Sequence, residues 1–99
     1  MLIIEKNITK ISELCKKHKV DALYLFGSAT NENFKDGSDI DFLVRFEKID
    51  LVRYFDNYIT FKEKLNKIFN REIDLVEEQT LKNSILINSI NRSKKLIYG

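Results

Sequence analysis

The sequence has no proline and no tryptophan, and it has only three glycines, one histidine and one cysteine. The lone cysteine, Cys15, excludes an internal disulfide, and its place among regularly spaced apolar residues predicts a buried thiol. The lone histidine, His18, has no second histidine with which to share a metal. It falls near the end of an expected helix, where a cation would meet the negative end of the helix dipole.

The chain also lacks long apolar runs and a large charge of one sign. No apolar stretch approaches the ~20 residues needed to cross a bilayer, and Glu5 to Asn7 interrupt any signal-peptide pattern. We therefore expect a cytoplasmic protein with no membrane partner. The formal net charge of +2 is too small to indicate direct nucleic-acid binding. The 99 residues contain no repeats or proline-rich linkers, which predicts a single domain over 1–99.

Two apolar runs frame the residues with the clearest chemical character. The first run ends at Gly27-Ser28, and the second begins with Asp39 and Asp41. Alternate side chains of a strand share a face, so both aspartates project together, opposite the apolar set that starts at Ile40. Such a pair repels unless a divalent cation offsets the charge. A glycine permits close backbone approach, and N–H groups at a helix start bind phosphate. The combination indicates nucleotide chemistry; taken alone, the two aspartates also fit a surface pair at a turn–strand junction.

Periodicity and turn composition predict the remaining elements. A strand near the end of the chain places Asp74 on the face opposite Ile73 and Leu75. The expected elements are a helix over 4–15, a strand over 20–26, a short helix over 28–33, a turn over 35–38, a strand over 39–46, a long helix over 51–69 behind an Asp50 N-cap, a strand over 72–77, a helix from a Thr80 cap to 91, and a short strand or extended tail over 94–98.

The long helix carries an apolar stripe that is rich in aromatic residues. Its members are Leu51, Tyr54, Phe55, Tyr58, Phe61, Leu65, Ile68 and Phe69. At helical spacing these residues are core more often than they form a ligand box. Any that stay exposed would mark a partner surface, with Tyr54, Tyr58 and Phe61 as candidates for an anchor cluster.

Gly27-Ser28, Asp39-Ile40-Asp41 and the later strand carboxylate Asp74 together resemble the nucleotidyltransferase fold shared with DNA polymerase β. The small size of the chain resembles the minimal nucleotidyltransferase (MNT) family, and the likeness extends from Ile8 to Tyr98. The resemblance implies an α/β (α+β) fold in which helices flank a mixed sheet.

The same resemblance implies roles for the site residues. Asp39 and Asp41 would bind Mg²⁺ and, through it, the triphosphate, and Asp74 would bind a second Mg²⁺ and help to deprotonate the acceptor hydroxyl. Gly27 and Ser28 would hold the β- and γ-phosphates. The reaction implied is transfer of an NMP, as AMP from ATP, to a partner protein.

Members of this family often carry an arginine shortly after the glycine-serine pair. Here Ala29-Thr30-Asn31 occupies that place, and Lys35 and Arg45 are the candidates to replace it. Minimal nucleotidyltransferases are commonly encoded beside a helical HEPN toxin, for which they act as the antitoxin. Two hypotheses follow: an enzyme that modifies a HEPN partner, or a weak or inactive domain that neutralises this partner by binding alone.

Overall fold

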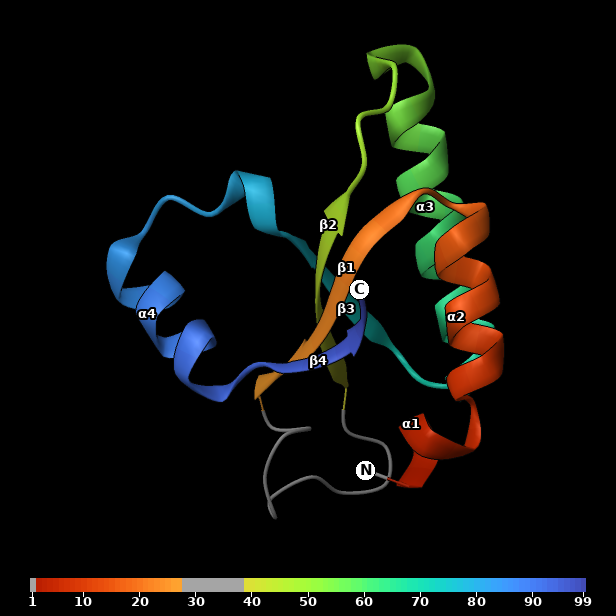
Figure 1. The fold of residues 1–99 in the computed structure, drawn as a ribbon, viewed down its shortest axis with the longest axis horizontal. Helices are drawn as coiled ribbons and strands as arrows, with labels where there is room; N and C mark the ends of the chain where they lie inside the picture. Colours follow the sequence, from red (N-terminus) through yellow and green to blue (C-terminus); the bar gives the residue numbers. More distant parts are fainter. Residues whose placement is uncertain (1, 28–38) are drawn as a thin grey trace.

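One mixed sheet lies at the centre of the computed structural model, which describes residues 2–27 and 39–99 (Figure 1). Its strands are β1 (Val20–Phe26), β2 (Ile40–Phe46), β3 (Ile73–Glu77) and β4 (Lys95–Tyr98), in the order β3-β2-β1-β4. β1 pairs antiparallel with β2 and β4, whereas β2 and β3 are parallel. The mixed sheet is confirmed, and β1, β2 and β3 lie within one residue of their predicted bounds. The expected tail over 94–98 is the edge strand β4.

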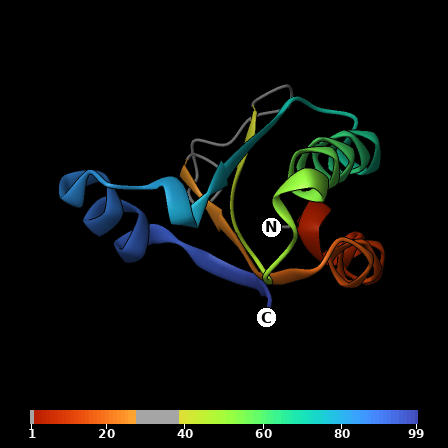
Figure 2. The same cartoon turned by 90° about the horizontal axis from the view of Figure 1, so that it is seen from above.

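Helices cover both faces of the sheet, as predicted. The helices α1 (Leu2–Lys6), α2 (Ile8–Lys17) and α3 (Leu51–Phe69) lie on one side, and α4 (Ser84–Ser93) lies on the other (Figure 2). A single 3₁₀ turn, η2 (Glu78–Thr80), links β3 to α4. In the part of the chain that the structure describes, none of the helices combines the length and the apolar character that crossing a membrane requires.

The hydrophobic core fills the space between the sheet and the pair α2–α3. The Phe42 and Phe69 rings lie 5.8 Å apart, and Phe61 meets Phe46 edge-on at 5.9 Å. The buried apolar side chains of this core include Ile11, Leu14, Cys15, Leu23, Leu25, Ile40, Phe42, Val44, Phe46, Phe61, Leu65, Phe69, Ile73 and Leu75. Burial of Cys15 is therefore confirmed, and it raises the pKa of the thiol to about 12, which leaves little reactive thiolate.

The predicted helix over 4–15 is interrupted at Asn7. The Asn7 side chain donates to the carbonyl of Ile3 at 2.8 Å, and this bond competes with continued helix. The chain therefore forms α1 and α2 separately, and Ile8 becomes an exposed residue at the start of α2. The apolar spacing gave no signal of this break because it continues across it.

The predicted cap of the last helix is also wrong. Thr80 donates its hydroxyl to the carbonyl of Glu77 at 2.8 Å and belongs to the 3₁₀ turn. The N-cap is Asn83, whose Oδ1 accepts from the amides of Ile85 (3.0 Å) and Leu86 (3.1 Å). N-cap preferences rank Asn above Thr, so Asn83 is also the better candidate by residue type.

The aromatic stripe of α3 is mainly core, as predicted, and the candidates for an exposed anchor cluster belong to that core. Phe61 is 0% exposed, and the Tyr58 hydroxyl donates to the carbonyl of Leu75 at 2.5 Å. Tyr54 is half-buried and donates its hydroxyl to Glu77. These three aromatic side chains therefore pack α3 against the sheet, and they do not form an exposed anchor cluster.

The most exposed apolar residues of α3 lie instead in its first turns. Leu51 is 87% exposed, Val52 90% and Phe55 69%. We call these three residues the α3 patch. A short segment, 47–50, connects β2 to this patch, and in Figure 1 this end of α3 extends past the sheet. The carbonyl of Asp50, at the predicted N-cap, accepts from the amides of Arg53 and Tyr54.

His18 lies at the C-cap of α2, but its surroundings disfavour the predicted cation. The residue is only 6% exposed and packs 5.7 Å from the Phe61 ring. Its Nδ1 lies 3.1 Å from Asn57 Oδ1, and Nε2 is buried without a hydrogen-bond partner among the described residues. Burial lowers the pKa of His18, the Asn57 bond opposes this, and the charges of Lys64 and Lys17 lower it further.

This environment predicts a stability that depends on pH. In the unfolded chain His18 titrates near 6.5, whereas the folded protein holds a lower pKa. As pH falls through 6.5, the unfolded chain takes up a proton that the folded one resists, so the free energy of unfolding should decrease. Urea unfolding on both sides of pH 6.5 measures this. His18→Gln, which cannot titrate, should reduce the change of the free energy of unfolding with pH. If that change is the same in the variant, other groups cause it.

Candidate active site

The strand pairing brings two of the predicted carboxylates into one row across the sheet. Asp41 of β2 lies opposite Asp74 of the parallel strand β3, and Phe26 of β1 lies opposite Asp41 on its other side. Residues directly opposite each other point to the same face. Asp39 comes immediately before β2 and is exposed, as is Asp74, while Asp41 is half-buried. The side chains of Asp41 and Asp74, which are far apart in the sequence, are therefore neighbours on one face of the sheet.

Gly27, directly after β1, provides the space that the Asp41 side chain occupies. Its φ of +73° is a conformation that L side chains rarely adopt. A Cβ at this position would clash with Asp41 Oδ2 and lie 3.2 Å from Cγ. Glycine is thus required both by the turn and by the carboxylate. Ser28, the second predicted phosphate-binding residue, lies outside the described residues, as do the expected helix over 28–33 and turn over 35–38.

The electrostatics of this row centre on Asp41. Burial raises the pKa of Asp41, and the charges of Asp74 and Asp39 and a side-chain hydrogen bond with Asp74 raise it further. Like charges are therefore concentrated where β2 and β3 lie side by side. Two carboxylates with this mutual repulsion form a donor set that suits a hard divalent cation.

No three His, Cys, Asp or Glu side chains within residues 2–27 and 39–99 already converge to hold a metal ion. Asp41 nevertheless lies opposite Asp74 on the neighbouring strand, and the charges of Asp74 and Asp39 both act on it. Ligation by all three would therefore need rotation of the exposed Asp39 and Asp74 side chains. Asp41, packed against Gly27, has the least freedom to move.

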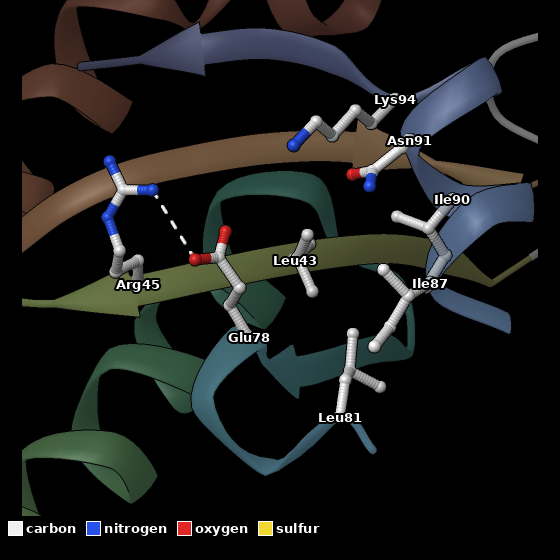
Figure 3. A pocket seen from close by; sticks show the side chains of 8 residues that line it. All are labelled: Leu43, Arg45, Glu78, Leu81, Ile87, Ile90, Asn91 and Lys94. Carbon is white, nitrogen blue, oxygen red and sulfur yellow. Dashed lines mark hydrogen bonds and ion pairs between the residues drawn. The ribbon is translucent and has the colours of Figure 1, made fainter. Parts of the chain in front are cut away.

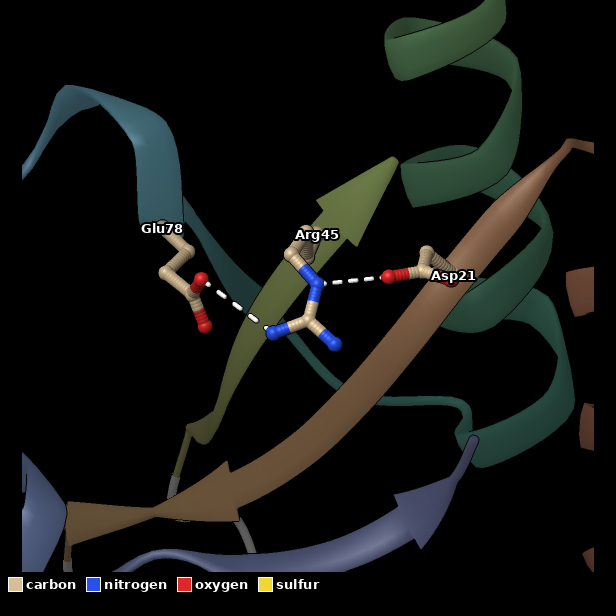
Figure 4. Close-up of polar contacts among 3 residues, drawn as sticks. All are labelled: Asp21, Arg45 and Glu78. Carbon is tan, nitrogen blue, oxygen red and sulfur yellow. Dashed lines mark hydrogen bonds and ion pairs between the residues drawn. The ribbon is translucent and has the colours of Figure 1, made fainter. Parts of the chain in front are cut away.

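Arg45, a candidate to replace the family arginine, is engaged elsewhere on the sheet. Its Nε lies 2.6 Å from Asp21 Oδ2, and its Nη1 lies 3.4 Å from Glu78 Oε1 (Figure 4). It is four strand residues from Asp41, or about 13 Å. Arg45 therefore does not take the place of the missing arginine. Lys35, the other candidate, lies outside the described residues.

The mixed sheet and the paired aspartates beside Gly27 agree with the resemblance to nucleotidyltransferases of the polymerase β type. A family model described as "Polymerase beta, Nucleotidyltransferase" matches residues 9–99. The chain belongs to this family, and the predicted fold class is confirmed.

Known proteins agree with this assignment. The "Putative protein adenylyltransferase MJ1379" of Methanocaldococcus jannaschii is 31% identical over 101 residues, covering 94% of this chain and 98% of the relative. A solved toxin–antitoxin structure with AMP-PNP has a TM-score of 0.70 at 25% identity, covering 94% of this chain and 73% of the other. A tri-AMPylated Shewanella oneidensis HEPN toxin in complex with MNT antitoxin has a TM-score of 0.66 at 23% identity, covering 97% and 72%.

Proposed function

We propose that this protein is a Mg²⁺-dependent nucleotidyltransferase that transfers AMP from ATP to a partner protein, and that it acts as the antitoxin of a HEPN toxin. The observation that carries the proposal is the pairing of Asp41 with Asp74 across neighbouring strands, beside Gly27 and next to Asp39. Membership of the nucleotidyltransferase family supports the reaction class.

The relatives support the finer parts of the proposal. A relative 31% identical over nearly its full length carries the name of a protein adenylyltransferase, which favours AMP and a protein acceptor. The toxin–antitoxin structure with AMP-PNP, at 25% identity, favours an adenine nucleotide and a toxin as the partner. The resemblance to minimal nucleotidyltransferases favours a partner of the HEPN type.

In the proposed reaction the acceptor is a hydroxyl group of the partner. Mg²⁺, as two ions held by Asp39, Asp41 and Asp74, would neutralise charge on the triphosphate and the transferring phosphoryl group. Asp74 takes the proton of the acceptor hydroxyl. The hydroxyl oxygen then bonds to the α-phosphorus, the bond from this phosphorus to the bridging oxygen breaks, and pyrophosphate leaves with the electron pair. Gly27 and Ser28 bind the β- and γ-phosphates.

Isotope position tests this reaction directly. The protein and a HEPN partner are incubated with Mg²⁺ and ATP labelled at either the α- or the γ-phosphate. AMP transfer leaves the α-label on the partner and releases the γ-label with pyrophosphate. Retention of the γ-label would identify a kinase-type transfer instead, and a partner without either label would contradict catalysis.

The alternative, neutralisation by binding alone, is favoured by a specific feature of this chain. Ala29-Thr30-Asn31 replaces the family arginine, and Arg45 is held by Asp21 and Glu78. Under this alternative an exposed apolar surface contacts the toxin. The α3 patch is such a surface, and it lies near the end of β2 that is remote from Asp41. The separation from Asp41 to Phe46 is about 17 Å along the strand, so a partner bound at both places must span this distance.

We expect Phe55→Ala to weaken partner binding by about 2 kcal/mol, because exposed aromatic anchors dominate interface energies. Calorimetric titration with the HEPN partner measures this. The control is Leu96→Ala, which truncates an exposed apolar side chain on β4, away from the α3 patch. Equal affinity for wild type and Phe55→Ala would remove the patch from the interface.

A toxicity-rescue assay with Asp41→Asn and Phe55→Ala then separates the two hypotheses. If the toxin is neutralised by transfer, neither variant rescues growth. If binding alone neutralises it, Asp41→Asn rescues and Phe55→Ala does not. Rescue by both variants would defeat both the α3 patch as the interface and catalysis as the means of neutralisation.

A further inference from the structure

A pocket of about 320 Å³ lies between the sheet and α4. Its lining includes neither the three site aspartates, Asp39, Asp41 and Asp74, nor the α3 patch. Leu43 of β2 forms its floor, and Leu81, Ile87 and Ile90 form an apolar wall (Figure 3). The volume is at the lower end of the range for small-molecule sites, which suits one ring system rather than a whole nucleotide.

The pocket shares a sheet face with the carboxylates. Leu43 is two residues after Asp41 on β2, so both side chains point to the same side, about 7 Å apart along the strand. On β3, Val76 lies opposite Leu43 just as Asp74 lies opposite Asp41. A group bound at the carboxylates could thus extend directly into the pocket. Gly27 lies in the opposite direction, beyond the row of Asp41.

The polar groups of the pocket suit an uncharged ring better than a phosphate. At one end Arg45 pairs with both Glu78 and Asp21, so its guanidinium is already engaged by two carboxylates and does not favour a phosphate there. Lys94 has its Nζ 4.3 Å from the centre of the Tyr24 ring, a cation–π contact that holds it at the rim. The Asn91 amide projects toward the middle of the pocket in Figure 3. A side-chain amide offers one donor and one acceptor, the pair that matches the N6 and N7 atoms of adenine.

We propose that this pocket binds the base of the nucleoside triphosphate and that Asn91 favours adenine there. The inference rests on the proposed function, since it places the α-phosphate at Asp41 and Asp74. The phosphate tail then runs toward Gly27, and the base runs the other way, over Leu43 and against Ile87. The apolar wall excludes water from the faces of the ring, and the Asn91 amide forms hydrogen bonds with N6 and N7 at its edge.

Binding measurements with ATP, CTP and inorganic tripolyphosphate, each with Mg²⁺, test this inference. Ile87→Trp fills the pocket and should weaken ATP binding about tenfold while leaving tripolyphosphate binding unchanged. Asn91→Leu should reduce the preference for ATP over CTP about tenfold, since one paired contact carries about that discrimination. Asn88→Leu is the matched control: the same change on an exposed position of α4 that does not line the pocket. It should bind all three ligands like wild type.

The outcomes separate this inference from the proposed function. Wild-type protein that binds neither ATP nor tripolyphosphate would overturn the proposed function, and the base site with it. If wild type binds ATP and Ile87→Trp binds it equally well, only the base site is overturned. If Ile87→Trp keeps ATP affinity but loses transfer, the pocket receives the acceptor side chain of the partner, which also overturns a base site.

Discussion

Replacing Asp41 by asparagine is expected to lower the rate of AMP transfer by about 10³-fold, the scale seen when one preorganised group that stabilises the transition state is lost. Asp41 is the carboxylate of the site with the least freedom, because it is half-buried and Gly27 packs against it. The amide keeps the shape of the side chain but removes the charge that the proposed cation needs. Transfer of α-labelled AMP to the partner, under saturating Mg²⁺ and ATP, measures the effect.

The same variant should fold normally. At neutral pH an ionised Asp41 is repelled by Asp74 and Asp39, as its raised pKa indicates, so removing the charge should keep or increase the free energy of unfolding. Asp56→Asn, the same change at an exposed position of α3, is the control and should alter neither property. A fully active Asp41→Asn protein would exclude Asp41 from the reaction, and an unfolded one would make its role structural.

Replacing Phe61 by alanine is expected to reduce the free energy of unfolding by about 3–5 kcal/mol. The Phe61 ring is fully buried, meets Phe46 edge-on and covers the His18 ring. The truncated side chain would leave a cavity at the point where α2, α3 and β2 meet. Because small domains have only about 5–15 kcal/mol of stability in total, this loss brings the protein close to unfolding at room temperature. Urea denaturation at neutral pH measures it.

Phe55→Ala is the matched control, since it removes the same ring from an exposed position of the same helix. It should change the free energy of unfolding by no more than about 0.5 kcal/mol. Similar losses for both variants would mean that the α3 patch is packed and not exposed. A loss below about 1 kcal/mol for Phe61→Ala would show that the core closes over the missing ring.

Much of the sheet could be predicted from sequence because side chains alternate along a strand. A continuous apolar run predicted β1, and alternation predicted the shared face of Asp39 and Asp41 and placed Asp74 opposite the core face of β3. Sequence alone could not show the register between strands, which puts Asp74 beside Asp41 and not one row away. The pocket residues of α4 gave no signal, since Ile87 and Asn91 read as an ordinary amphipathic helix.

The predictions that failed concern residues whose role depends on tertiary contacts. Tyr54 and Tyr58 lie on a stripe that is predicted as core, but the sequence also allows them to be exposed; their hydroxyl bonds to β3 hold them against the sheet. His18 reads as a helix-end cation until Asn57 and Phe61 enclose it. Asn7 ends a helix through a local bond to Ile3 that apolar periodicity does not register.

The parallel pairing of β2 with β3 means that the carboxylate row cannot form early in folding. Parallel neighbours need a crossover, and here the whole of α3 must cross the sheet before Asp74 can reach Asp41. Contacts so distant in sequence form late because the loop-closure entropy must be overcome first. A nascent or partly folded chain therefore exposes Asp41 without its counterpart. The site would then become active only in the fully folded chain. An antitoxin built this way would act on its toxin only after its own synthesis and folding are complete.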